Sequence, residues 1–287
     1  MIVVTGATGQ LGRLVIAQLL ERGVPASGIV AAVRSPSKAA DLAARGVQLR
    51  EADYAKPDTL AKAFAGAKRL LLISSSELGQ RLPQHLAVIA AARQAGVGQL
   101  VYTSLLHADR SPLGLAAEHL GTEQAIAAAG LPHVLLRNGW YTENYLASVP
   151  AALQHGVFLG AAGEGRIASA TRADYAAAAA AVLTQPVAGH RVYELAGDSA
   201  YTLAELVAEL NRQTGKAVRY QNLPQADFAA ALVGAGLPQP VAQLLADSDA
   251  GAAQGGLFDD SRELGTLIGR PTTPLAAALK ATLAVKV

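Results

Sequence analysis

Short apolar runs alternate with longer stretches of helical periodicity over the first half of the chain. The apolar runs are rich in leucine and β-branched residues and predict strands, and the stretches between them predict helices. The predicted strands are Ile2–Thr5, Ile29–Val33, Val47–Arg50, Arg69–Ser74, Gln99–Ser104 and His133–Arg137. The predicted helices include Gln10–Arg22, Thr59–Ala65, Leu82–Ala95 and Leu115–Ala129. This alternation is typical of a parallel sheet that helices cover on both faces.

Glycines separate many of these predicted helices from the strands that follow. They stand at Gly23, Gly46, Gly66, Gly96 and Gly130. Glycine adopts the left-handed backbone that ends a helix without a steric cost, so this punctuation supports repeated strand–helix units. We therefore predict an α/β fold with a doubly wound parallel sheet of the Rossmann type.

The rhythm breaks after Asn138. Residues 151–169, 201–228 and 237–252 mix helical patterns with short turns, while Thr171–Leu183 and Val192–Leu195 are expected to add one helix and one strand to the main sheet. We expect a sheet domain of residues 1–137, joined by about 171–196. Residues 138–170 and 197–287 are expected to form a smaller capping lobe.

Composition narrows the class of protein. With 287 residues, of which 51% are hydrophobic, the chain can bury a sizeable core. The formal charge is +2 and the basic residues are spread along the sequence, so a nucleic-acid partner is not expected. The absence of cysteine excludes disulfides, thiolate chemistry and cysteine-ligated metal sites.

Neither export nor membrane insertion is expected from the sequence. The first residues lack a cationic segment and a cleavage site, and no apolar run reaches the roughly 18 residues that span a bilayer. We therefore expect a cytoplasmic protein. No metal is expected, because the sequence has no His-Glu-x-x-His motif, no calcium loop and no clustered His and Asp residues.

A glycine-rich turn follows the first predicted strand and opens the first predicted helix. It reads Gly6-Ala7-Thr8-Gly9-Gln10-Leu11-Gly12. Gly6 allows a tight turn, Gly9 lets backbone amides approach an anion, and Gly12 is expected to permit close packing of helix on sheet. Amides at a helix N-terminus attract phosphate, so this turn predicts a bound dinucleotide pyrophosphate, and the sheet domain is a dinucleotide-binding domain.

The end of the second strand predicts the cofactor. The residue that reads the adenosine ribose lies about 20 residues beyond the glycine turn, and Arg34 stands there with Lys38 nearby. A guanidinium complements a 2′-phosphate, so NADPH is expected rather than NADH. Asp53 and Tyr54 should lie near the adenine. Ser74, Ser75 and Ser76 should line the cofactor cleft, although serines at a strand end also cap helices.

The helix after the fifth strand departs from the usual dehydrogenase pattern. Short-chain dehydrogenases carry Tyr-x-x-x-Lys there, whereas this chain carries His119 and Glu123, and no lysine occurs between Lys68 and Lys216. Reactions that need a strong positioned acid are therefore disfavoured. Three hypotheses remain: a reductase of quinones, a reductase of another planar electrophile such as a triarylmethane dye, and a non-catalytic NADP-binding redox sensor.

The sequence resembles the NmrA-like atypical short-chain dehydrogenases, and within them the bacterial NAD(P)H:quinone oxidoreductases. The resemblance rests on residues 5–12, 71–77, 102–109, 136–141, 167–175 and 255–260. Triarylmethane reductases share the glycine turn and the Leu-Arg-Asn segment, whereas Ser-Ser-Ser-Glu and Ser-Leu-Leu-His favour the quinone enzymes. Related proteins also include redox sensors without activity.

The resemblance implies a set of cofactor contacts and a quinone substrate. The implied contacts are Gly6, Ala7, Thr8, Gly9, Gln10, Leu11, Arg34, Ser74, Ser75, Ser76, Asn138, Gly139, Trp140, Tyr141, Thr142 and Glu143.

Aromatic residues near the sixth strand suggest where a flat quinone would stack. Trp140, Tyr141 and Tyr145 suit such a ring, with Asn138 or Asn144 bonding an oxygen, but they equally suit packing of the capping lobe. We therefore name Trp140, Tyr141 and Asn144 as substrate candidates. His107 and His119 are weak candidates for a catalytic role.

Overall fold

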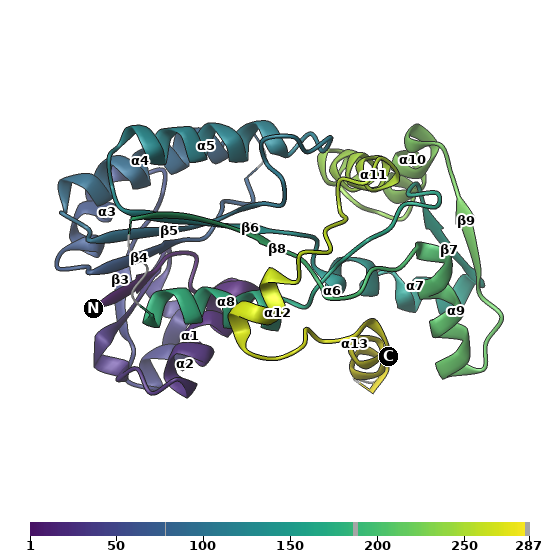
Figure 1. The fold of residues 1–287 in the computed structure, drawn as a ribbon, viewed down its shortest axis with the longest axis horizontal. Coiled ribbons are helices and arrows are strands. Elements are labelled where there is room, and N and C mark those ends of the chain that lie inside the picture. The colour runs from purple at the N-terminus through teal and green to yellow at the C-terminus, as the bar shows by residue number, and fades with distance from the viewer. Residues whose placement is uncertain (78, 186–188, 285–287) are drawn as a thin grey trace. The chain divides into compact units, whose positions relative to one another are not determined.

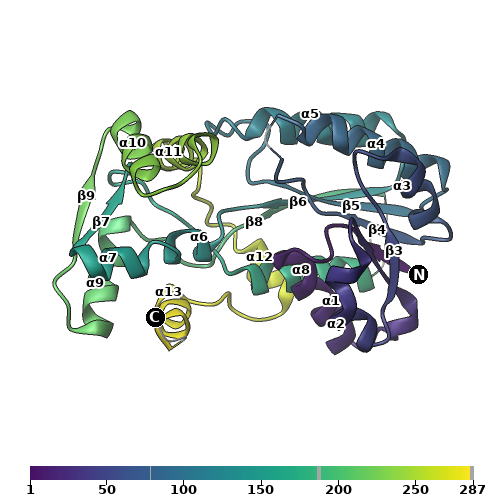
Figure 2. The ribbon, with the colours of Figure 1, turned by 180° about the vertical axis from the view of Figure 1, so that it is seen from behind.

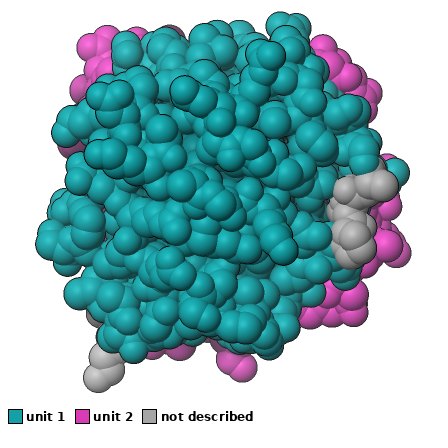
Figure 3. All heavy atoms as spheres, turned by 90° about the vertical axis from the view of Figure 1, so that its left-hand side faces the viewer, with its two compact units in different colours: residues 1–105, 117–138, 172–193 teal, residues 106–116, 139–171, 194–287 magenta. Residues whose placement is uncertain are grey.

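The computed structural model describes residues 1–77, 79–185 and 189–284. The chain divides into two compact units. Unit 1 comprises residues 1–105, 117–138 and 172–193, and unit 2 comprises residues 106–116, 139–171 and 194–287, coloured teal and magenta in Figure 3. The predicted domain ranges differ from these units mainly at residues 106–116, which cluster with unit 2. Residues 186–188 and 285–287 of the predicted ranges lie outside the described residues.

A seven-stranded sheet in the order β3-β2-β1-β4-β5-β6-β8 forms the centre of unit 1 (Figure 1). Its strands are β1 (Ile2–Val4), β2 (Ile29–Val33), β3 (Gln48–Glu51), β4 (Arg69–Leu72), β5 (Gln99–Leu105), β6 (His133–Asn138) and β8 (His190–Leu195). The pairings from β3 through β6 are all parallel. The order reverses next to β1, as in a doubly wound fold, so the predicted fold class is confirmed.

Helices cover both faces of this sheet, as Figures 1 and 2 show from opposite sides. One face carries α3 (Pro57–Phe64), α4 (Arg81–Gln94) and α5 (Ala116–Ala128), and the other carries α1 (Gln10–Glu21), α2 (Ala40–Ala44) and α8 (Arg172–Thr184). Short 3-10 helices occupy Ala26–Gly28 and Pro36–Ala39. The alanine-rich α8 is buried from Asp174 to Leu183, because small side chains allow close packing.

The core of unit 1 forms where strand side chains meet α3, α4 and α5. Leu70, Leu72 and Leu100 from the strands belong to one buried cluster with Phe64 and Val88 from the helices. The glycines expected to end helices have left-handed φ angles: +81° at Gly23, +82° at Gly46, +75° at Gly66, +66° at Gly96 and +70° at Gly130. The predicted helix–glycine–strand punctuation is therefore confirmed.

Unit 2 is mostly helical. Its helices are α6 (Thr142–Leu146), α7 (Val149–His155), α9 (Leu203–Thr214), α10 (Gln225–Gly234), α11 (Gln239–Ala253), α12 (Glu263–Ile268) and α13 (Leu275–Ala284). Strands β7 (Val157–Gly160) and β9 (Arg219–Asn222) pair in parallel. A capping box begins α9, where Thr202 and Glu205 bond each other's backbone amides. Within the described ranges, no helix is long and apolar enough to cross a membrane.

Candidate functional site

The glycine turn connects β1 to α1. Gly6 has a φ of +58°, and the Gly9 amide donates a hydrogen bond to the Gly6 carbonyl at 2.9 Å. No side chain caps the N-terminus of α1 at Gly9. Amides in the first turn of a helix have no partner within the helix, so they remain available to an anionic ligand. The local geometry therefore fits a pyrophosphate.

Gly12 stands where the backbone leaves no room for a Cβ atom. A Cβ atom at this position would lie 2.4 Å from the Gly6 carbonyl oxygen and 2.7 Å from the Ala7 Cα. These atoms belong to the turn that follows β1, and the predicted close packing of the helix on the sheet stays a prediction. The first turn of α1 thus lies directly against the glycine turn, which fixes the direction of the helix N-terminus.

Hydrogen bonds join the ends of neighbouring strands beside this turn. The Tyr54 hydroxyl lies 2.5 Å from Thr5 Oγ1 and 2.9 Å from the Ile73 carbonyl oxygen. Thr5 Oγ1 in turn donates to the Leu71 carbonyl at 2.9 Å. Burial raises the pKa of Tyr54 well above its ordinary value. Its hydroxyl therefore serves to hold the strand ends together, while Asp53 accepts the Ala55 amide at 3.0 Å.

Arg34 directly follows β2 and extends into solvent. Its side chain is 71% exposed, and its Nη1 donates to Glu77 Oε1 at 2.7 Å. Glu77 Oε2 accepts a second hydrogen bond from Gln84 Nε2 at 2.6 Å. The sequence predicts that the guanidinium of Arg34 binds a 2′-phosphate. In the structure this guanidinium already donates a hydrogen bond to the carboxylate of Glu77. No pattern along the chain indicates this ion pair, because Arg34 and Glu77 follow different strands.

The serines after β4 have different environments. Ser74 donates its amide to Thr103 Oγ1 at 2.9 Å, and Ser75 donates its amide to His85 Nε2 at 2.9 Å. The Ser75 hydroxyl also bonds Gln84 Oε1 at 2.5 Å, so this side chain holds its own loop. Ser76 is exposed. The predicted cofactor contacts of all three stay a prediction.

Two polar side chains of α5, His119 and Glu123, are buried and hydrogen-bonded. His119 is buried, with Nδ1 2.7 Å from the Tyr102 hydroxyl. Burial, followed by the charge of Arg81, holds the pKa of His119 well below its ordinary value. Glu123 accepts hydrogen bonds from Ser104 at 2.5 Å and from Arg137 Nη2 at 2.7 Å. These contacts hold both side chains against neighbouring residues of unit 1, and a catalytic role for His119 stays a prediction.

The segment after β6 begins with a buried acceptor that has no partner. Asn138 Oδ1 is buried and accepts no hydrogen bond within the described structure. Buried polar atoms are almost always bonded, so this oxygen suits a donor from a ligand. Further along, the Gly139 amide donates to the Leu195 carbonyl at 2.7 Å, and the Thr142 hydroxyl lies 2.8 Å from Ser169 Oγ. Tyr141 and Glu143 are half-buried.

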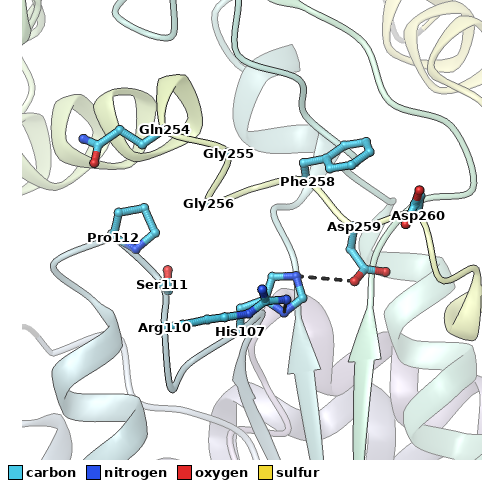
Figure 4. Close-up of a pocket in the computed structure, with 10 residues that line it drawn as sticks. All are labelled: His107, Arg110, Ser111, Pro112, Gln254, Gly255, Gly256, Phe258, Asp259 and Asp260. Atoms are coloured by element: carbon cyan, nitrogen blue, oxygen red, sulfur yellow. Dashed lines mark hydrogen bonds and ion pairs between the residues drawn. The ribbon is translucent and has the colours of Figure 1, made fainter.

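A cavity of about 370 Å³ lies within unit 2, between two segments of the chain (Figure 4). The first segment holds His107, Arg110, Ser111 and Pro112, and the second runs from Gln254 to Asp260. His107 has a left-handed φ of +53°. Its Nε2 lies 3.3 Å from Asp259 Oδ2, and its Nδ1 lies 3.4 Å from Glu194 Oε2.

A smaller cavity of about 40 Å³ contains part of the predicted aromatic cluster. Trp140, Asn144 and Tyr145 line it together with Phe228 and Asp249. Trp140 and Tyr145 are buried within unit 2, in keeping with the packing alternative for this cluster. Contact of Trp140, Tyr141 and Asn144 with a substrate stays a prediction.

Asp249 is a buried carboxyl that the sequence did not single out. It accepts the Ala161 amide at 2.8 Å and the Tyr145 hydroxyl at 3.1 Å. Burial raises its pKa to about 6. Its partners lie far away in the sequence, so no local pattern marks it. Among the described residues, no group of three or more histidines, aspartates and glutamates is arranged to hold a metal ion.

The fold is of the Rossmann type found in dehydrogenases, with an uncapped N-terminus of α1 and an arginine after β2. It is atypical because α5 carries His119 and Glu123 in place of the tyrosine and lysine of short-chain dehydrogenases. The chain belongs to the NmrA-like family, whose family model matches residues 1–267. The predicted family is thereby confirmed.

Individual relatives extend this result over nearly the whole chain. The sequence is 63% identical to quinone oxidoreductase 2 of Escherichia coli (strain K12) over 281 residues, which cover 97% of each chain. The structure is similar to the crystal structure of NADPH-dependent quinone oxidoreductase QOR2 from E. coli complexed with NADPH, with a TM-score of 0.95, 62% identity and coverage of 99% and 100%. It is also similar to Citrobacter sp. triphenylmethane reductase complexed with NADP(H), with a TM-score of 0.94, 40% identity and coverage of 98% and 100%.

Proposed function

We propose that this protein is an NADPH-dependent quinone oxidoreductase. The observation that carries the proposal is the likeness to E. coli quinone oxidoreductase 2 over nearly the full length of both chains. The E. coli structure was solved with NADPH, which agrees with the guanidinium of Arg34 after β2. The likeness to triphenylmethane reductase makes a dye the second acceptor to examine.

Three features of unit 1 fit a bound dinucleotide. The uncapped N-terminus of α1 suits the pyrophosphate, and the exposed guanidinium of Arg34 suits the 2′-phosphate. The buried Oδ1 of Asn138 would accept a hydrogen bond from a donor on the cofactor. We propose that the remaining contacts are those predicted from the sequence: Gly6–Leu11, Ser74–Ser76 and Gly139–Glu143.

The contacts of α5 explain why a quinone is the preferred acceptor class. Bound NADPH supplies a hydride from its dihydronicotinamide ring. His119 is held at Tyr102 and Glu123 is held by Arg137, so α5 presents no free acid. A quinone tolerates this, because its reduction gives a delocalised hydroquinone anion that takes its proton from water. The chain's task is then to bind and orient both reactants.

Anaerobic mixing of the protein with NADPH and an acceptor tests the proposal. Benzoquinone and naphthoquinone should oxidise the NADPH faster than a triarylmethane dye does, as followed by the loss of NADPH absorbance. Faster reduction of the dye would make the protein a dye reductase. Tight NADPH binding without reduction of any acceptor would make it a redox sensor. We also propose a cytoplasmic location, which cell fractionation tests.

A further inference from the structure

The two cavities described in unit 2 differ in what they can hold. Small-molecule sites usually enclose about 300–1,000 Å³, and the larger cavity, at about 370 Å³, lies within this range. The smaller cavity has about 40 Å³, which suits one or a few water molecules, since each fills about 30 Å³ of liquid. A quinone ring therefore fits the larger cavity and not the smaller one as it stands.

One wall of the larger cavity is formed by a turn in which His107 has a left-handed backbone conformation. His107 lies two residues after β5, and its carbonyl accepts the amides of Arg110 at 2.8 Å and Ser111 at 2.7 Å. Its own amide donates to Glu194 Oε2 at 2.9 Å. Left-handed backbone is uncommon outside glycine and recurs at functional sites. The tight turn brings the guanidinium of Arg110 to within 3.3 Å of the His107 ring.

Both acidic and basic side chains lie at this cavity, and among them the guanidinium of Arg110 suits the oxygens of a quinone. Asp259 and Glu194 lie beside His107. Arg110 is exposed, and among the described residues its Nε and Nη1 donate to no protein acceptor. Quinone carbonyls only accept hydrogen bonds and a guanidinium only donates them, so the two are complementary.

The opposite segment supplies an aromatic ring and a carboxylate. Phe258 is 36% exposed, among the large apolar residues with the greatest exposure in the described structure, and it lines the same cavity as Arg110 (Figure 4). An exposed ring beside a cavity suits stacking with a flat acceptor. The exposed Asp260 can accept the hydroxyl of a hydroquinone and would repel an anionic acceptor. The cavity thus favours a neutral quinone.

We propose that the cavity between residues 107–112 and 254–260 is the acceptor site, where Arg110 donates a hydrogen bond to a quinone oxygen and Phe258 contacts the ring. The assignment rests on the proposed function, and it moves the quinone away from Trp140 and Asn144. It also makes Arg110 the main determinant of acceptor affinity.

The test uses substitutions of two exposed residues with matched controls. Arg110→Ala should raise the KM for 1,4-naphthoquinone about tenfold, and Phe258→Ala should raise it about threefold. Both variants should keep the kcat and the NADPH dissociation constant. Arg212→Ala, which removes another exposed arginine of unit 2, and Val241→Ala, which trims another exposed apolar residue, should leave the KM unchanged.

A binding measurement separates this proposal from the proposed function. Calorimetric titration of the NADP⁺-loaded protein with 1,4-naphthoquinone involves no turnover. Weakened binding in Arg110→Ala would support the site even if the wild type reduced no quinone. An unchanged dissociation constant in both cavity variants, or no binding to the wild type, would overturn the assignment. A KM raised by Trp140→Ala alone would place the acceptor at the smaller cavity.

Discussion

The turn between β1 and α1 in unit 1 and the larger cavity of unit 2 would present different kinds of group to a ligand. The turn offers backbone amides, and its shape depends on Gly6, which takes a left-handed φ, and on Gly12, which has no room for a Cβ atom. The cavity offers the side chains of Arg110 and Phe258, from segments more than a hundred residues apart. A site formed by backbone amides can come from a few consecutive residues. A site formed by side chains of distant segments forms only when the chain has folded.

We expect the largest loss of stability and of NADPH binding from a substitution at Gly12. Gly12→Ala places a Cβ atom 2.4 Å from the Gly6 carbonyl oxygen, so the turn and α1 must move apart. Overpacking of this kind costs about 1–3 kcal/mol, and we expect a lower melting temperature with loss of NADPH binding. Gly28→Ala is the control, because its nearest atom would be 4.0 Å away. Normal NADPH binding by Gly12→Ala would show that the binding turn does not depend on glycine at this position.

Arg34 is the side chain that we expect to discriminate between NADPH and NADH at the site formed by the glycine turn. Arg34→Asp replaces a guanidinium with a charge that repels the 2′-phosphate. Charged hydrogen bonds contribute about 1.5–3 kcal/mol, so NADPH affinity should fall by about a hundredfold while NADH affinity changes little. Fluorescence titration of both cofactors measures the ratio. Equal losses would show that Arg34 does not read the phosphate.

Asp249 gives unit 2 a pH dependence that the glycine turn lacks. Burial raises the folded-state pKa of Asp249 to about 6 from an ordinary 3.8, so the unfolded chain loses this proton first as the pH rises. The free energy of unfolding should therefore fall between pH 4 and pH 6, by at most about 3 kcal/mol from this group. Asp249→Asn should flatten that part of the curve in urea denaturation. Parallel curves for the two proteins would contradict the assignment.

Glu77 should have the smallest effect. Its carboxylate would compete with a 2′-phosphate for the guanidinium of Arg34, and exposed ion pairs contribute about 0.2–1 kcal/mol. Glu77→Gln should therefore strengthen binding of adenosine 2′,5′-bisphosphate by up to about fivefold and leave ADP binding unchanged. Glu209→Gln, which changes the net charge equally on α9, serves as the control. Weaker bisphosphate binding in Glu77→Gln would mean that Glu77 positions Arg34 instead of competing for it.

The same contrast explains which elements the sequence predicted. Strand β2 was predicted with its observed bounds, because a continuous apolar run marks a buried parallel strand. Strand β9 was not predicted, because its residues Arg219–Asn222 are polar and mostly exposed. Helix α2 has only five residues, too few to show a helical period. Periodicity thus reveals elements that bury a face and misses short ones at the surface.

For the candidate site, the sequence was informative where function is local. The glycine turn and Arg34 follow strands at fixed spacing, so their places could be predicted. The partnership of Arg34 with Glu77 and the burial of Asp249 against Tyr145 join residues far apart in the sequence. No pattern along the chain encodes such pairs, since they arise only when separate elements pack together.

The contacts of α5 limit which side chains this helix can carry at positions 119 and 123. Position 119 now packs against Tyr102, and position 123 now neutralises Arg137 in the core. Replacing His119 with tyrosine and Glu123 with lysine would take the Glu123 carboxylate away from Arg137 and place a second cation beside it, at a cost of several kcal/mol. Those two replacements alone should therefore lower the melting temperature of the protein. A compensating change at Arg137 would be needed before α5 could carry a Tyr-x-x-x-Lys pattern.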